Sequence, residues 1–327
     1  MKLTNMKNLV SLLLIFIIFI SIGYSQNPGM EKWKESIIKN NVKAQIQWNY
    51  KYKKNGKLNK EGYKNFQKSF DNKGNIIEEN YFRSGDLSQE IKYKYDNKEN
   101  TIEYKNFKTS LNKMLFKQNI TYDDNNNKIR EERFNGSEYN IIAYSYSKDG
   151  KLSEIIKYNK TYDVEQTRKL VYNNDLCTIT VFDSNNNIIG KQINKFDSNK
   201  NIIETIEYNS QNKIEKRFIY SFNEKNKIVS KTEFALNNFI STETYKYDTK
   251  NRLIKVLKEQ PKGNVYVNNI YKYNSADYLI EEQWYDDDPT KYSTKEYFYD
   301  KNNLVEKAKV FYALYNYRIL YKFKYKY

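Results

Sequence analysis

The sequence offers few side chains that could do chemistry. It contains no His and one Cys among 327 residues, which excludes Ser-His-Asp and Cys-His mechanisms as well as zinc sites that contain His. Cys177, in the stretch DLCTITVF, has no His to activate it and stands in a strand-like context, so we interpret it as a buried structural thiol. The sequence has no Walker A motif and no GxGxxG motif placed between a strand and a helix. We therefore expect no catalytic residue and no cofactor.

Paired carboxylates could do chemistry without any His. Glycoside hydrolysis needs two of them, and Glu78, Glu79, Glu281 and Glu282 are candidates. These residues recur at equivalent places of a repeat, which favours Lys–Glu pairs across strands on a solvated face. A carbohydrate-active hydrolase with paired carboxylates is therefore an alternative and not the main prediction.

An acidic triplet could offer oxygen ligands to calcium. Asp286, Asp287 and Asp288 precede Pro289, but the Gly and the distal Glu of an EF-hand loop are missing. We interpret the triplet as a solvated acidic loop and expect no metal site.

The charge balance is basic. Lys and Arg number 56 against 40 Asp and Glu, a net charge of +16. The first 25 residues hold two Lys and no acid, so the rest of the chain carries 54 minus 40, or +14. Outside the cytoplasm, such a balance points towards polyanions such as surface polysaccharide, lipid headgroups or released DNA, but the even spread of Lys favours a generally basic, solvated surface. Scarce Arg argues against nucleic acid as the partner.

Candidate binding residues follow from this balance. Lys94, Lys246 and Lys272 occupy equivalent positions of the repeat, and Trp284, beside the acidic loop, could stack on a sugar ring. Trp33 and Trp48 are weaker candidates of the same kind.

The N-terminal segment has the pattern of a secretory signal peptide. Lys2 and Lys7 precede an apolar run from Leu9 to Ile22, and cleavage is expected between Ser25 and Gln26. The run of 14 residues is shorter than the roughly 20 that a spanning helix needs. We expect a signal peptide over 1–25, a lead-in segment over 26–41, no membrane span in the mature chain, and a secreted or periplasmic location.

Residues 42–327 read as one array of repeats. FDSNKNIIETIEY (196–208) has relatives along the chain, such as FDNKGNIIEENYF near the start. Each unit has aromatics two apart, then Asp or Asn with a polar run, then paired aliphatics. The first part has the period of a strand, the Asp or Asn forms a turn through its own backbone, and the aliphatics begin a second strand. The aromatic that opens each turn falls at Phe70, Tyr95, Tyr122, Tyr146, Tyr172, Phe196, Phe222, Tyr247, Tyr273 and Tyr299.

This pattern predicts an all-β fold. We expect an antiparallel meander of β-hairpins, with a period of about 25 residues and on the order of 20 strands. A sheet of that size tends to curl. We therefore expect a coiled sheet or open spiral shell with Tyr, Phe and Ile inside and Lys, Glu and Asn outside. An elongated single-layer ribbon is the alternative.

The repeats resemble YD repeats of the Rhs type. The likeness is carried by YKYDNKENTIEY (93–104), YKYDTKNRLIKV (245–256) and YKYNSADYLIEE (271–282). Asn usually replaces the Gly of the family pattern, and the period is longer. The resemblance implies a shell-forming array, which in large relatives surrounds a toxin domain. Here we expect a small stand-alone exported relative without a toxin domain, to which the family's function does not transfer.

These observations favour an exported, non-enzymatic scaffold or binding protein. An envelope polyanion, a glycan or a protein is the expected partner. Besides the hydrolase, an immunity-type partner of an exported toxin is an alternative, suggested by the resemblance alone.

Overall fold

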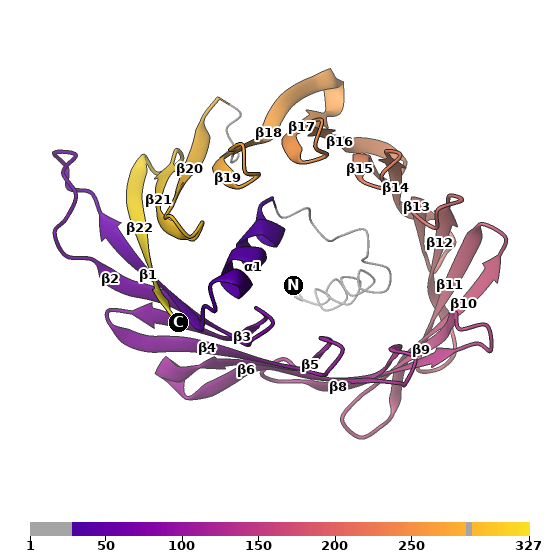
Figure 1. Ribbon diagram of the computed structural model, residues 1–327. Coiled ribbons are helices and arrows are strands. Elements are labelled where there is room, and N and C mark those ends of the chain that lie inside the picture. The colour runs from indigo at the N-terminus through magenta and orange to yellow at the C-terminus, as the bar shows by residue number, and fades with distance from the viewer. Residues whose placement is uncertain (1–27, 286–289) are drawn as a thin grey trace, which may run out of the picture.

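The computed structural model describes residues 28–285 and 290–327, in which a 22-stranded antiparallel sheet forms a ring (Figure 1). The expected signal peptide and the acidic triplet lie outside these residues. The helices are α1 (Met30–Lys39) and the 3₁₀ turns η2 (Thr109–Leu111) and η3 (Pro261–Gly263). The strands are β1 (Ala44–Lys51), β2 (Tyr63–Phe70), β3 (Ile76–Arg83), β4 (Asp86–Tyr95), β5 (Thr101–Lys108), β6 (Lys113–Tyr122), β7 (Lys128–Phe134), β8 (Tyr139–Tyr146), β9 (Leu152–Tyr158), β10 (Val164–Asn173), β11 (Leu176–Asp183), β12 (Ile188–Phe196), β13 (Ile202–Asn209), β14 (Ile214–Phe222), β15 (Ile228–Ala235), β16 (Asn238–Tyr247), β17 (Leu253–Gln260), β18 (Asn264–Tyr273), β19 (Leu279–Tyr285), β20 (Tyr292–Tyr299), β21 (Val305–Tyr312) and β22 (Tyr317–Lys326).

The sheet closes on itself. Each strand pairs with its neighbours in sequence, and β22 also pairs with β1, from Ala44↔Lys326 to Lys51↔Ile319. The all-β meander of hairpins is confirmed, but the open spiral shell is wrong, and so is the elongated ribbon. The physical reason is that β1 pairs with the edge of β22, so that among the described strands neither edge of the sheet is left open.

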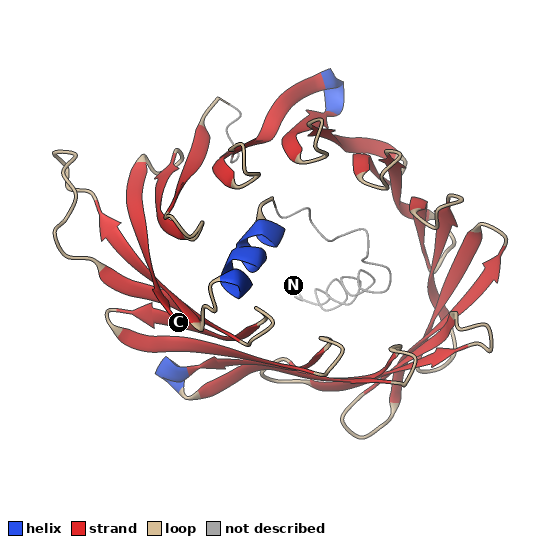
Figure 2. Ribbon diagram, viewed as in Figure 1, coloured by secondary structure: helices blue, strands red, loops and turns tan. Residues whose placement is uncertain are grey.

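Helix α1 lies inside the ring, against the seam between β1 and β22 (Figures 1 and 2). Ile37, 1% exposed, packs with Val42, Phe70 and Leu304, and Trp33 contacts the same cluster. Gly74 permits this packing, because a Cβ on it would lie 2.7 Å from Cγ1 of Ile38. Within the described residues, no helix is long and apolar enough to cross a membrane.

The predicted polar turns form one end of the barrel, which we call the Asx rim. It consists of the connections that follow even-numbered strands. In a typical turn, Oδ1 of Asp197 accepts hydrogen bonds from the backbone N–H groups of Asn199 and Asn201, at 2.9 and 2.8 Å. The fourth turn residue, here Lys200, has a positive φ of 67°. The interpretation of this Asp as a turn former is confirmed. The connection after β10 is an exception, because Asn173 pairs with Leu176 and the turn is shorter.

The connections that follow odd-numbered strands form the other end, which we call the opposite rim. They are more varied, from the two-residue turn Ser84–Gly85 to the loop of residues 52–62. In Figure 2, η2 and η3 mark this rim at the outer edge of the ring, whereas turns of the Asx rim curl towards its interior.

The aromatic pairs that open each repeat lie on the inner face of the wall. Trp33 of α1, which lies inside the ring, packs on Phe70 of β2. Tyr93 and Tyr95 are two residues apart on β4, so they share one face of that strand, and this is also the inner face. The second Tyr of the pair bonds to the preceding repeat, since Oη of Tyr95 donates to the carbonyl of Ile76 at 2.8 Å. The same bond recurs for Tyr122, Tyr146, Tyr247, Tyr273, Tyr299 and Tyr325, at 2.7–3.4 Å.

The second set of aromatics lies on the outer face. These residues stand near the opposite rim, on the face that alternates with the inner one: Phe134, Tyr158, Phe182, Tyr208, Phe234, Tyr285 and Phe311. The expected segregation, aromatics inside and charges outside, is therefore only partly right. A single-layer wall has two faces to cover, and both use aromatics.

Candidate binding surfaces

The three Lys residues predicted to bind are exposed on the outer wall. Lys94 pairs with Glu103 at 3.2 Å, and Lys272 pairs with Glu281 at 3.0 Å. Lys246 stands opposite Lys255 on the neighbouring strand. Figure 1 places β16 and β18 close together but β4 on another part of the ring, so the three do not form one row. Their role in binding stays a prediction.

Trp284 lies on the other face of the wall. It is half-buried on the inner side of β19, where its ring meets that of Tyr312 edge-on with centroids 6.0 Å apart. The structure therefore does not bring Trp284 together with Lys94, Lys246 or Lys272.

The neighbouring glutamates considered for hydrolysis point to opposite faces. Glu281 pairs with Lys272 outside, whereas Glu282 accepts a hydrogen bond from Tyr297 inside, at 2.6 Å. Glu78 and Glu79 alternate in the same way, with ion pairs to Lys92 and Lys68 respectively. Neither pair of adjacent carboxylates could flank one glycosidic bond.

Buried charge on the inner face centres on Glu131 of β7. This residue has no exposed surface, and it accepts hydrogen bonds from Gln118 at 2.6 Å and Tyr144 at 3.1 Å. Lys128, 3.0 Å away, and Arg133 form ion pairs with it. Burial lowers the pKa of Lys128 to about 8 and raises that of Tyr144 to about 12. No sequence pattern indicates this cluster, because its members look like other alternating strand residues.

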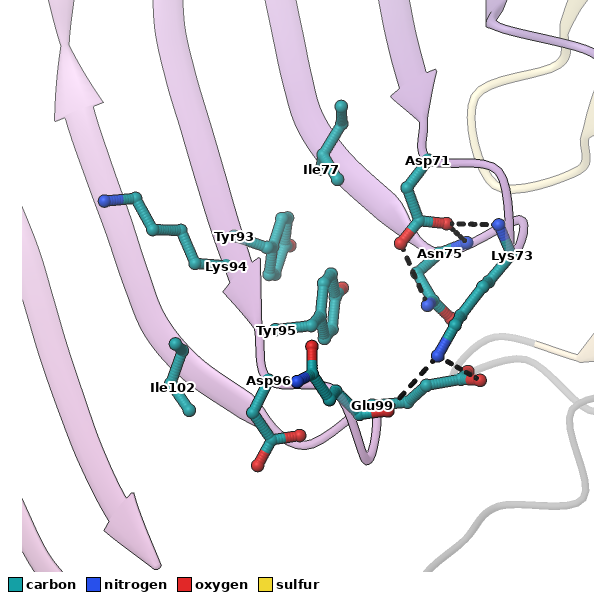
Figure 3. A pocket seen from close by; sticks show the side chains of 11 residues that line it. Asp71, Lys73, Asn75, Ile77, Tyr93, Lys94, Tyr95, Asp96, Glu99 and Ile102 are labelled. Atoms are coloured by element: carbon teal, nitrogen blue, oxygen red, sulfur yellow. Dashed lines mark hydrogen bonds and ion pairs between the residues drawn. The ribbon is translucent and has the colours of Figure 1, made fainter.

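Two turns of the Asx rim border a shallow depression of about 390 Å³ (Figure 3). Tyr93 and Tyr95 stack beside it, with ring centroids 6.5 Å apart. Lys73 reaches from one turn to Glu99 of the next, at 3.4 Å. A hydrogen bond from Asn75 is the main cause that lowers the pKa of Glu99, and Lys73 adds to it. The charged groups around the depression thus bind one another.

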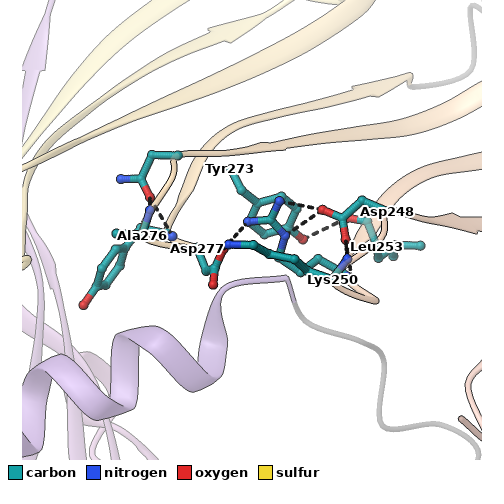
Figure 4. Close-up of polar contacts among 9 residues, drawn as sticks. Asp248, Lys250, Leu253, Tyr273, Ala276 and Asp277 are labelled. Atoms are coloured by element: carbon teal, nitrogen blue, oxygen red, sulfur yellow. Dashed lines mark hydrogen bonds and ion pairs between the residues drawn. The ribbon is translucent and has the colours of Figure 1, made fainter.

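Charged groups also bind one another farther round the Asx rim (Figure 4). Arg252 donates to Asp248 at 2.7 Å and to Asp277 of the next turn at 2.6 Å, and its guanidinium lies 4.5 Å from the ring centre of Tyr273. Lys250 also contacts Asp277, at 2.6 Å. These contacts join successive turns, so we interpret the Asx rim as structural.

The outer wall carries a band of aromatic rings, each covered by a cation. Near the opposite rim of successive hairpins, Lys191 lies 4.4 Å from the ring centre of Tyr208, and Arg217 lies 5.7 Å from that of Phe234. The other members are Lys169 over Phe182 and Arg318 over Phe311, at 5.6 and 5.5 Å. We call these four pairs the outer band. The sequence showed the aromatics, but the facing cations depend on strand register.

Cys177 is buried on β11, as predicted. It has no exposed surface and packs with Ile155, Leu170 and Ile179. Burial raises the pKa of its thiol to about 11, which suits a structural role.

Comparisons with known proteins find only distant structural similarity. No protein-family profile and no curated protein matches the sequence. Among solved structures, the Tc holotoxin pore of Photorhabdus luminescens, with a mutation in TccC3, is 12% identical over 78% of this chain and 19% of that chain, with a TM-score of 0.28. This chain therefore spans about a fifth of that one.

Two porin-like proteins match as well. The one from Bacteroides uniformis is 9% identical over 87% of this chain and 96% of that chain, with a TM-score of 0.31. The one from Bacteroides vulgatus is 13% identical over 60% and 96%, with a TM-score of 0.23. All of these likenesses are distant, and no family is assigned.

Proposed function

We propose that this chain is an exported, non-enzymatic binding protein that takes an anionic glycan or related polyanion of the cell envelope on its outer wall. The outer band is the observation that supports the proposal. Aromatic faces stack on sugar rings, and Lys and Arg attract carboxylate or phosphate groups. The pairs built on Phe182, Tyr208 and Phe234 belong to consecutive hairpins, which lie roughly 10 Å apart. A polymer lying across the strands would meet all three.

The many charged side chains on the outer face of the barrel favour contact of this face with water and not with lipid. Lys92 contacts Glu90 at 2.9 Å, Lys94 and Lys105 flank Glu103, and Arg130 pairs with Glu132. A basic side chain on the lipid face of a barrel costs about 2–4 kcal/mol at mid-membrane. We accordingly propose a secreted or periplasmic location, in keeping with the expected signal peptide.

Binding of the mature chain to an anionic polysaccharide tests this function. We expect affinity to fall steeply with added salt, because each contact is exposed and screened. Replacing Lys169, Lys191 and Arg217 together by Gln should weaken binding about tenfold or more without lowering stability, which corresponds to about 0.5 kcal/mol or more per contact.

Two further variants make the test specific. Replacing Lys94, Lys246 and Lys272 by Gln should weaken binding less, because these three do not form one row across neighbouring hairpins (Figure 1). Trp284→Ala, on the inner face, should leave binding unchanged. Salt-insensitive binding of a small neutral sugar that is lost in Trp284→Ala would contradict the proposal.

A further inference from the structure

Large exposed apolar side chains gather at the opposite rim. Leu111, Tyr162, Leu236, Val265, Leu314 and Tyr315 are each more than half exposed, from 54% to 75%. All six lie at or beside connections that follow odd-numbered strands. Scattered exposed residues are ordinary, but apolar residues at the tips of many hairpins of one rim form a pattern that points to a contact.

The backbone at Leu236 strengthens this argument. Leu236 is 68% exposed and has a φ of +48°, a conformation that disfavours residues with a side chain. Comparable connections use Asn212 or Gly85 at positive φ. A leucine there has a conformational cost without the burial that would offset it. Such a residue points to a function outside the folded chain.

Lysines lie in the same set of connections, and some of them stand beside the apolar tips. Lys53, Lys54 and Lys57 are exposed in the loop of residues 52–62, Lys108 and Lys113 stand on either side of Leu111, and Lys262 precedes Val265. In the described part of the chain, none of these six forms an ion pair. Acidic residues also occur in connections of this rim, among them Glu138, Asp163 and the triplet of residues 286–288, but Lys outnumbers acidic residues in the three loops named here.

We propose that the opposite rim docks on an anionic lipid surface. The apolar tips enter the boundary between headgroups and acyl chains, and the lysines contact the negative headgroups. Surface binding of this kind gains from buried apolar area and from attraction to anionic lipid together. The barrel then stands on the membrane by one end, and the outer band lies on the part of the wall next to the docked tips. This inference goes beyond the proposed glycan binding and uses different residues.

Co-flotation of the mature chain with lipid vesicles tests the docking. We expect binding to phosphatidylcholine vesicles that contain phosphatidylglycerol, little binding to phosphatidylcholine alone, and loss of binding in high salt. Leu236→Asn should weaken vesicle binding about tenfold, because it removes one leucine side chain that would be buried in the lipid. The same change should stabilise the fold, because Asn suits the left-handed turn. A loss of binding therefore cannot be attributed to unfolding.

Val171→Ser is the matched control. Val171 is 64% exposed, but it stands on β10 near the Asx rim, so its replacement should leave vesicle binding unchanged. Equal losses in Leu236→Asn and Val171→Ser would overturn the proposal, as would equal binding to neutral vesicles. If Leu236→Asn instead dissociates an oligomer, the rim contacts a second copy and not lipid. Binding to soluble polysaccharide but to no vesicle would refute the docking and leave the proposed function intact.

Discussion

Asp197 shows how a repeated residue can be structural without being invariant. Its Oδ1 accepts two backbone N–H groups, and its Oδ2 accepts the side-chain amide of Asn201 at 3.0 Å. In the turn at Asn159 the arrangement is reversed, since the Asn donates to Asp163. Oδ1 of Asn159 accepts the backbone N–H groups of Thr161 and Asp163, each at 2.9 Å, so an amide oxygen can replace the carboxylate oxygen in this turn.

Accordingly, Asp197→Asn should barely change stability, whereas Asp197→Ala should lower it visibly. Phe196→Ala should cost about 2–3 kcal/mol, less than a fully buried Phe, because Phe196 is only half-buried against the core. Urea melts of the three variants check this. A loss in Asp197→Asn as large as that in Phe196→Ala would indicate a chemical role for the carboxylate.

The buried tyrosines set an alkaline limit on stability. Burial is the main cause that raises the pKa of Tyr144, Tyr220 and Tyr273 to about 12, against about 10 in the unfolded chain. Folding favours the neutral phenol. The contribution of these phenols to the free energy of unfolding is therefore complete below about pH 10 and is lost as the pH rises towards 12. We expect tyrosinate absorbance and loss of strand circular dichroism to rise together in that range. Ionisation of these phenols near pH 10 in a still-folded barrel would contradict the assignment.

For single residues, the sequence predicts the structural role of a side chain better than the residues that it contacts. The turn formers and the buried Cys177 follow from local chemistry and are confirmed. Glu131, Arg217 and Trp284 could not be placed, because which face a strand residue occupies depends on bulges and on register with its neighbour.

Among the elements, α1 carries the most specific packing. Its Ile37 contacts Phe70 and Leu304, which come from the two ends of the chain. Ile37→Ala should therefore lower the free energy of unfolding by about 2–4 kcal/mol. Met30→Ala, at a position that is 44% exposed, should change it by less than about 0.5 kcal/mol. Equal effects in chemical denaturation would mean that α1 does not hold the seam.

Strand β22 is the second element with a defined role. A chain that ends at Asn316 would lose β22 and leave both β21 and β1 with an unpaired edge. Such edges are templates for aggregation, so this chain should be aggregated or oligomeric in size-exclusion chromatography. A soluble, monomeric chain of this length would show that closure is dispensable.

The hairpins could be predicted, because each is encoded by about 25 contiguous residues. These residues comprise an aromatic pair, a polar turn and an aliphatic pair. Helix α1 was not predicted. Residues 26–41 carry no repeat signal, and Ile37 finds its partners only in the closed barrel.

For the whole molecule, closure was beyond the sequence. Curling follows from the number of strands, but whether a curled sheet meets itself depends on the twist and register accumulated over all of them. A small change per hairpin separates a ring from a spiral. The pairing of Ala44 with Lys326 spans almost the full chain, and no local pattern encodes it.

The pairing of β1 with β22 has a consequence for the order in which the chain can fold. β1 needs β22 to complete its hydrogen bonds on one side. If the chain is exported from its N-terminus, as proposed above, β1 emerges first, and the barrel can close only when translocation is nearly finished. The same adjacency makes the fold a natural substrate for circular permutation. The two ends could be joined by a short linker and the chain cut at a turn of the Asx rim. The first and last strands of the new chain would then be two strands that form a hairpin in the present one, and the barrel would close by pairing those two strands.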